Sequence, residues 1–246
     1  LDSRLRKWSA EIPDVLQLNG STTLTYSCMD EMDGDIGASG PRFEAHIFQL
    51  QALALKLAYE NTRILVHRPL LTYKSIPPAE TAIEDPCTLT RDTVKLSLQS
   101  CRHAALATSD IESNSIFSLA AGTYAAAFIG IHTFTAGVML CILISIGPLG
   151  RQSYESKMGL RRLLRMQSLL KSRSNSTLAP QGLEILHRLT RLVMDKELKE
   201  LLKASEDDPV SSPQPIGSMD EPAAQNPNES DHTLVDNGLI MDEAML

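Results

Sequence analysis

Residues 116–146 read IFSLAAGTYAAAFIGIHTFTAGVMLCILISI and lie inside a stretch, 113–150, without a single charged side chain. A helix that is apolar on every side is either the buried core of a bundle or a membrane span. Three glycines and several hydroxyl side chains dilute the stretch, and only 138–146 is densely apolar. Those nine residues rise about 14 Å as a helix, well short of a hydrocarbon core of about 30 Å. We therefore expect one or two buried helices at the centre of a helical domain, with a transmembrane helix in 116–146 as the alternative.

The segments on either side of this stretch have the periodicity of amphipathic helices. Apolar residues recur every three or four positions over 1–12, 42–67, 91–109, 152–172 and 181–203. The last segment adds charge pairs at i,i+4, namely Glu184–Arg188, Asp195–Lys199 and Lys196–Glu200. Pro and Gly predict long connections over 19–42 and 70–89. With one Trp, five Phe and five Tyr, the core must be mainly aliphatic. The predicted fold is all-α: a multi-helix bundle of long amphipathic helices around a central buried apolar helix.

Charge divides the chain into two parts. The net charge is −7, yet residues 205–246 hold ten acids and no Lys or Arg, which leaves 20 acids against 23 bases in 1–204. Five prolines also fall in 205–246, so we predict a folded domain over 1–204 and a disordered acidic tail over 205–246. Apolar residues return among the acids near the end, a pattern typical of activation segments. The residues of this candidate activation segment are Leu239, Ile240, Met241 and Met245.

Catalytic and metal-binding motifs are not found in the sequence. The four cysteines contain no CxxC pair, and no HxxxH, HExxH, GxSxG or P-loop pattern occurs. Cys101 and His103 stand two apart on a helix and point in different directions, so they do not form a nucleophile pair. His132 is expected to be a hydrogen-bonded core residue. Seven Lys and Arg in 151–173 predict a solvated basic helix face, with Lys157 on it. We predict no enzyme activity, no cofactor and no metal in this chain, with an α-helical enzyme of unknown chemistry as a further alternative.

Two stretches taken together resemble a known family. The opening LDSRLRKWSAEIP places Leu1, Leu5, Trp8 and Pro13 in the spacing L-x-x-x-L-x-x-W-x-x-x-x-P. The long helix closes on a hydrophobic–His-Arg-Pro–hydrophobic signature made by Val66, His67, Arg68, Pro69 and Leu70. A Cys-x-x-Ala-Ala element follows at Cys101, Ala104 and Ala105, and then His132 and Phe134 open the most apolar part of the chain. The order and spacing of these motifs over residues 1–203 resemble the fungal-specific transcription factor domain, the middle homology region of zinc-cluster transcription regulators.

The resemblance implies the C-terminal part of an all-α regulatory domain that controls transcription by RNA polymerase II in the nucleus. In that family an N-terminal two-zinc, six-cysteine module reads the DNA, and this chain does not contain it. DNA binding and zinc are therefore expected only in a longer parent protein, with homodimerisation also through that parent. The expected partners are transcriptional coactivators or other proteins, without direct nucleic-acid binding or membrane contact by this chain. The motif residues are expected to be structural: Trp8 packs between helices, His67 and Arg68 cap a helix end, and Pro69 breaks it.

Overall fold

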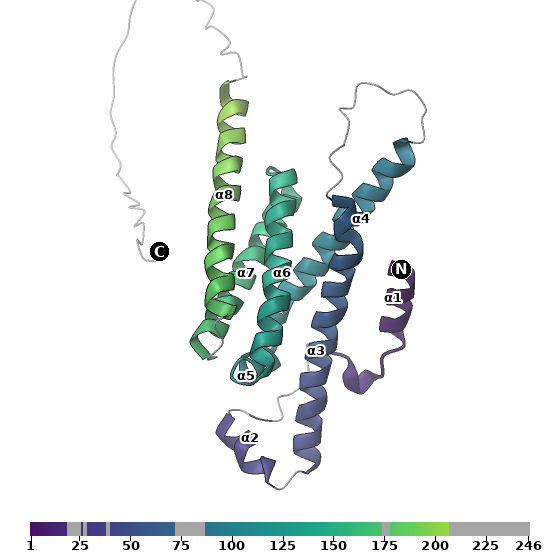
Figure 1. Cartoon of the computed structure of the whole chain (residues 1–246), viewed down its shortest axis with the longest axis vertical. Helices are drawn as coiled ribbons and strands as arrows, with labels where there is room; N and C mark the ends of the chain where they lie inside the picture. Colours follow the sequence, from purple (N-terminus) through teal and green to yellow (C-terminus); the bar gives the residue numbers. More distant parts are fainter. Residues whose placement is uncertain (19–25, 27–28, 38–39, 72–86, 174–177, 207–246) are drawn as a thin grey trace, which may run out of the picture. The chain divides into compact units, whose positions relative to one another are not determined.

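The computed structural model describes residues 1–18, 26, 29–37, 40–71, 87–173 and 178–206 (Figure 1). Every regular element in these residues is helical, which confirms the all-α prediction. The α-helices are α1 (Asp2–Ala10), α2 (Met29–Ile36), α3 (Pro41–His67), α4 (Cys87–Asp110), α5 (Ser115–Ala120), α6 (Ala125–Ile146), α7 (Arg151–Arg173) and α8 (Leu178–Glu206). Short 3₁₀ helices occur at η1 (Asp14–Leu16), η2 (Arg68–Leu71) and η3 (Ile111–Ser113). The predicted tail, 205–246, lies almost wholly outside the described residues.

The charge-free stretch forms two helices, α5 and α6, in agreement with the prediction of one or two buried helices. The carboxamide of Asn114 accepts a hydrogen bond from the Ile116 amide at 3.1 Å and caps α5. α6 follows and packs against α3, α4, α7 and α8, which makes it the centre of the bundle. Leu140, Leu143 and Ile144 of α6 are almost completely buried. The dense aliphatic end of the sequence is therefore the core of the domain.

α6 also meets the criteria of length and composition for a membrane span. Within the described residues it is the one helix that does so, and 56% of its most apolar window is buried inside the bundle. The core helix of a soluble protein passes the same test. The packing of α6 against four other helices favours this second interpretation.

A buried amide on α7 connects it to the central helix. Gln167 donates from Nε2 to the carbonyl of Gly130 and to Oγ1 of Thr133, both at 2.7 Å. The carbonyl of Gly130 and the hydroxyl of Thr133 lie on α6, where a neighbouring helix approaches closely. This explains why a polar residue stands among the leucines of the buried face of α7.

Most basic side chains of α7 are exposed, in agreement with the predicted solvated face, but Lys157 is half-buried and three of these side chains pair with acids on other elements. Arg162 pairs with Asp110 at 2.8 Å and Arg165 with Glu112 at 2.7 Å, which ties α7 to the end of α4 and to η3. Lys157 pairs with Glu197 of α8 at 2.6 Å. The partners are far away in the sequence, so helix periodicity alone could not identify them.

Two connections are shorter than the sequence predicts. α2 lies within the predicted loop 19–42, and α4 begins at Cys87, inside the predicted connection 70–89. α2 is held by tertiary contacts: the hydroxyl of buried Tyr26 donates to Asp35 at 2.8 Å, and Arg42 pairs with Glu31 at 3.1 Å. Burial raises the pKa of the Tyr26 hydroxyl, and its hydrogen bond to Asp35 raises it further.

Candidate functional site

Three of the six motif residues in the sequence prediction lie on α3 or on the two helices, α1 and α4, that pack against it. Trp8 lies on α1, His67 at the end of α3 and Cys101 on α4, and their contacts lie where these helices cross, which we call the α1–α3–α4 junction. Pro13 lies away from it as the residue that precedes η1. Arg68 and Pro69 belong to η2, and both are exposed.

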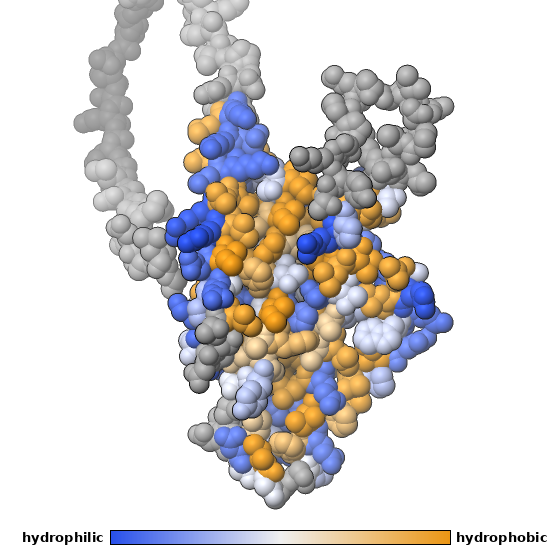
Figure 2. Space-filling model, in the orientation of Figure 1, coloured by the Kyte–Doolittle hydropathy of each residue, from blue (hydrophilic) through white to orange (hydrophobic). Residues whose placement is uncertain are grey.

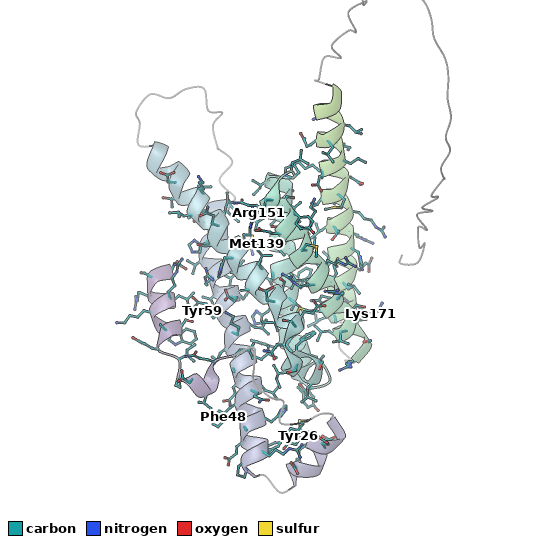
Figure 3. All side chains as sticks on the ribbon, turned by 180° about the vertical axis from the view of Figure 1, so that it is seen from behind. Tyr26, Phe48, Tyr59, Met139, Arg151 and Lys171 are labelled. Carbon is teal, nitrogen blue, oxygen red and sulfur yellow. The ribbon has the colours of Figure 1, made fainter. Side chains whose placement is uncertain are left out.

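Trp8 attaches α1 to α3 from the outside. Its ring stacks on that of Tyr59 with the centroids 6.3 Å apart and the planes inclined by 30°. Figure 3 shows Tyr59 on the flank of α3 that faces α1. Trp8 is nevertheless 43% exposed, and no residue of α1 is buried. Trp8 therefore packs between α1 and α3 as predicted, although part of its ring stays exposed.

His67 joins three helices and does not cap one. Its Nδ1 lies 3.2 Å from the hydroxyl of Ser97 on α4, and its Nε2 lies 3.2 Å from Asp2 Oδ1 on α1. Burial raises the pKa of the Asp2 carboxyl, but the interaction with His67 and the charge of Arg6 lower it by more, so the net shift is downward. α3 ends at His67, just before Pro69 as predicted, and the chain continues directly as η2. Arg68 is the C-cap residue of α3 as predicted, and its backbone N–H donates to the carbonyl of Ile64, whereas the side chain of His67 does not take part in the cap.

A buried ionic cluster, which the sequence prediction missed, lies next to His67 on α3. Glu60 and Arg63 are 1% and 6% exposed. Glu60 accepts hydrogen bonds from Lys56 at 2.8 Å and from Arg63 at 2.9 Å. Nη1 of Arg63 also lies 3.1 Å from Nδ1 of His103 on α4. A guanidinium can only donate, so Nδ1 must accept and the proton of the neutral ring must be on Nε2.

The thiol of Cys101 is not arranged for nucleophilic chemistry. It is fully buried and donates weakly to the carbonyl of Ile64, with a sulfur–oxygen distance of 3.9 Å. Burial raises its pKa to about 11, although the nearby charge of Arg63 opposes this. The thiol is therefore protonated at neutral pH. His103 points to Arg63, in agreement with the prediction that Cys101 and His103 do not act as a pair.

His132 differs from the prediction of a hydrogen-bonded core residue. Its ring is only partly buried and packs edge-on against Phe128, with the centroids 4.2 Å apart. Its Nδ1 is buried and has no hydrogen-bond partner among the described residues. Burial lowers the pKa of this ring, since the charged form would lose its hydration.

A pocket of about 440 Å³ lies between η1, the first half of α3 and the start of α5. Its apolar wall includes Val15, Phe48 and Ile116, and Asp14 and Glu44 supply carboxylates. No Lys, Arg or His lines it, so the charge of its lining is negative. The volume is within the range of small-molecule sites, but both carboxylates are exposed to solvent.

Metal-binding groups of three or more His, Cys, Asp or Glu side chains do not occur in the described part of the chain. The candidate activation residues Leu239, Ile240, Met241 and Met245 lie outside the described residues. Comparisons of the chain with protein-family models, with curated proteins and with solved structures find no match. The function must therefore be argued from the fold, the α1–α3–α4 junction and the sequence motifs.

Proposed function

We propose that this chain is the C-terminal part of the regulatory domain of a fungal zinc-cluster transcription regulator. In this proposal it works in the nucleus through partner proteins, while the DNA is read by a zinc module outside this chain. The regulated process is transcription by RNA polymerase II. The acidic tail recruits coactivators, and the helical domain controls that recruitment.

The observation that supports the proposal is the α1–α3–α4 junction. The three motifs that carry the resemblance are far apart in the sequence, at Trp8, His67 and Cys101. In space, Trp8 contacts α3, His67 reaches both α1 and α4, and the Cys101 thiol meets a carbonyl of α3. Short motifs that match a family by chance have no reason to pack on one another. The contacts between the helices that carry them favour a single architecture over three coincidences of composition.

The chemistry of the domain suits a structural and regulatory role. The charged groups of the α1–α3–α4 junction are paired with each other, and its thiol is protonated. Residues 1–204 carry only three more bases than acids, and several of those bases are paired within the bundle. Strong binding to a DNA backbone needs many unpaired cations, so contact with DNA is assigned to the parent protein.

A reporter assay tests the proposal. The full chain is fused to an unrelated DNA-binding domain, and the expected result is activation of a reporter gene. Activation should fall when Leu239, Ile240 and Met241 are replaced by Ala while the acids are kept, because the apolar side chains supply the affinity for a coactivator. The matched control replaces Val210, Ile216 and Met219, three apolar residues elsewhere in the tail, and should keep full activity. A silent fusion, or equal loss in both triple variants, contradicts the proposal.

A mobility-shift assay tests the assignment of DNA binding. The chain alone should form no sequence-specific complex with duplex DNA at about 150 mM salt. A specific complex that survives this salt concentration would place the DNA-reading surface in this chain and overturn that part of the proposal.

The membrane alternative is based on α6 alone. If α6 crossed a bilayer, the expressed chain would stay in the membrane fraction after an alkaline carbonate wash. The proposal expects the chain in the supernatant without detergent.

A further inference from the structure

α1 is attached to the bundle without a buried side chain of its own. None of its nine residues is buried. Figure 2 shows mainly hydrophilic side chains over this helix, at the right edge of the face in view. Its aromatic contact is the stacking of Trp8 on Tyr59, and its contact with the end of α3 is that of Asp2 with His67. A change in the strength of either contact should therefore change how firmly α1 is held.

His67 has a polar atom opposite each of its ring nitrogens. Nε2 lies 3.2 Å from Oδ1 of Asp2 on α1, and Nδ1 lies 3.2 Å from the hydroxyl of Ser97 on α4. The side chains of His67 and Asp2 are only 15% and 23% exposed. Nε2 and Oδ1 are themselves shielded from water, and neither has a hydrogen-bond partner elsewhere among the described residues. Each of these two atoms therefore depends on the other.

The surroundings of His67 suit a protonated ring. In the neutral ring, Nε2–H points to the carboxylate and Nδ1 accepts from Ser97, because the other tautomer would set a lone pair against the carboxylate. In the protonated ring both nitrogens donate, and the hydroxyl of Ser97 turns so that its oxygen accepts. His103 is the opposite case, since its Nδ1 faces the guanidinium of Arg63, which can only donate. Of these two histidines, His67 is the one placed to take up a proton.

The cations nearest to His67 are directed at other groups or at solvent. They are Arg6 on α1, Arg63 one turn earlier on α3 and the exposed Arg68 of η2. Arg6 pairs with Oδ2 of Asp2 at 2.8 Å, and Arg63 pairs with Glu60 at 2.9 Å. α4 presents the uncharged hydroxyl of Ser97 to the ring. Among the described residues, the charged group in contact with His67 is therefore the carboxylate of Asp2.

Asp2 stays ionised over the pH range in which histidine changes its charge. Burial raises the pKa of the Asp2 carboxyl, but the hydrogen bond from His67 and the charge of Arg6 lower it by more, so this pKa lies below the ordinary value of 3.8. Histidine gains or loses its proton between about pH 5 and 8. Within that range, the charge of the contact between Asp2 and His67 changes only on the ring.

We infer that protonation of His67 converts its contact with Asp2 into an ion pair and holds α1 more firmly on the bundle. The added attraction is present below the pH at which His67 titrates and is lost as the pH rises through it. Since both side chains are largely shielded from water, salt screens this pair less than a surface pair. The inference goes beyond the proposed function and does not depend on it, because it concerns contacts within this chain.

Trp8 is the single tryptophan of the chain and reports on α1 directly. In heteronuclear NMR spectra of the full chain, its indole N–H signal should move through one step between about pH 5.5 and 7.5, in parallel with the ring signals of His67. Acrylamide, an uncharged quencher, should quench the fluorescence of Trp8 more strongly at the higher pH. The expected ratio of the quenching constants is about 1.5, with an upper limit of about two because the docked ring is already 43% exposed.

Variants with matched controls assign this step to the contact. Asp2→Asn removes the charge, and His67→Gln keeps an amide donor without a titrating proton, so the step should vanish in both. Arg6→Gln removes the other partner of Asp2, and His187→Gln removes an exposed histidine of α8, so the step should remain in both. Acetylation of the N-terminal amine should also leave it, which excludes a titration of that amine near pH 8. Circular dichroism at both pH values verifies that the bundle is folded.

Three results would overturn the inference. The first is a Trp8 signal that does not move in this pH range. The second is a step that persists in Asp2→Asn or His67→Gln, or one that Arg6→Gln also abolishes, because the contact with His67 would then not be its source. The third is stronger quenching at pH 5.5 than at pH 7.5, which would mean that protonation loosens α1.

Discussion

At the scale of single residues, the ionic cluster on α3 shows how charges are kept inside the bundle. Glu60 is almost fully buried, yet it accepts hydrogen bonds from both Lys56 and Arg63. Arg63 in turn contacts His103 on the neighbouring helix. Each buried charge therefore has a partner. Removal of one partner leaves the other charge buried and unpaired, and the cost of its lost hydration is then no longer offset.

Substitution of Arg63 by Met should lower the free energy of unfolding by about 3 kcal/mol, because Glu60 loses its buried partner. Lys56→Met removes the other partner of Glu60, but Lys56 is 39% exposed, so the loss should stay below about 1 kcal/mol. The double variant Glu60→Leu/Arg63→Met should lose less than the sum of its two single variants. Urea unfolding measures the free energy of unfolding of the three single variants and the double variant. Additive losses for Glu60→Leu and Arg63→Met would contradict the coupling between these two residues.

Stability should decrease as the pH falls from about 7 to about 5, because two histidines are held neutral by burial. Burial lowers the pKa of His46 and of His132 below the ordinary value of 6.5. Below pH 6.5 the unfolded chain binds these protons first, so protonation favours unfolding until the pH falls below the native pKa values. The variant His46→Asn/His132→Asn should show a flatter dependence in urea unfolding at a series of pH values. The same slope in both proteins would contradict this explanation.

At the scale of helices, glycine sets the distance between α7 and its neighbours. A Cβ at Gly159 would lie 2.6 Å from Leu106 Cδ2 and 3.1 Å from Leu140 Cδ1. A Cβ at Gly130 of α6 would meet only Leu170 Cδ1, at an ordinary 3.9 Å. Glycine therefore serves a packing need at Gly159 and none at Gly130.

Gly159→Ala should lower stability by about 1–3 kcal/mol, since the packed side chains of Leu106 and Leu140 must shift to admit the methyl group. Gly130→Ala should raise it by up to about 1 kcal/mol, because alanine restricts the unfolded chain and favours a helix. Thermal unfolding of both variants gives the sign of each change. Stabilisation by Gly159→Ala would show that the contact between these helices is looser than the distances indicate.

The sequence predicts the long helices because their evidence is local. Apolar spacing and Pro69 give the bounds of α3 almost to the residue, and the charge-free stretch gives the central helix. α2 escapes prediction because its eight residues, MDEMDGDI, are acidic and contain Gly34, both unfavourable to a helix alone. Its stability comes from contacts with Tyr26 and Arg42, and no local sequence pattern predicts these contacts.

The α1–α3–α4 junction is predictable only in part. Lys56 and Glu60 are four residues apart on one helix face and can be paired from the sequence. The contact of Arg63 with His103 and that of His67 with Asp2 join residues that are tens of positions apart. Such contacts depend on how helices cross, which a single sequence does not specify.

At the scale of the whole molecule, the position of α6 makes the fold depend on one helix. Leu140 is fully buried on it, and Leu140→Asp should unfold the domain, because an unpaired buried carboxylate costs several kcal/mol and total stability is only about 5–15 kcal/mol. Leu96→Asp makes the same chemical change on α4 at a residue that is 63% exposed, and should alter stability by less than about 0.5 kcal/mol. Circular dichroism distinguishes the two outcomes. Equal loss of helical signal would contradict the central position of α6.

α1 contributes least to the core, since none of its residues is buried. It is attached to the bundle through the contacts of Trp8 with Tyr59 and of Asp2 with His67. Such a helix can lift from the surface and return while the bundle behind it stays folded. Its backbone amides should therefore exchange with deuterium long before those of α6, which open only when the whole domain unfolds. Mass spectrometry should find peptides of α1 deuterated early, and Trp8→Ala should accelerate that exchange without changing that of α6. Equal protection of the two helices would mean that α1 is an integral part of the cooperative unit. Early exchange would make it a hinged flap, whose opening uncovers the ring of Tyr59.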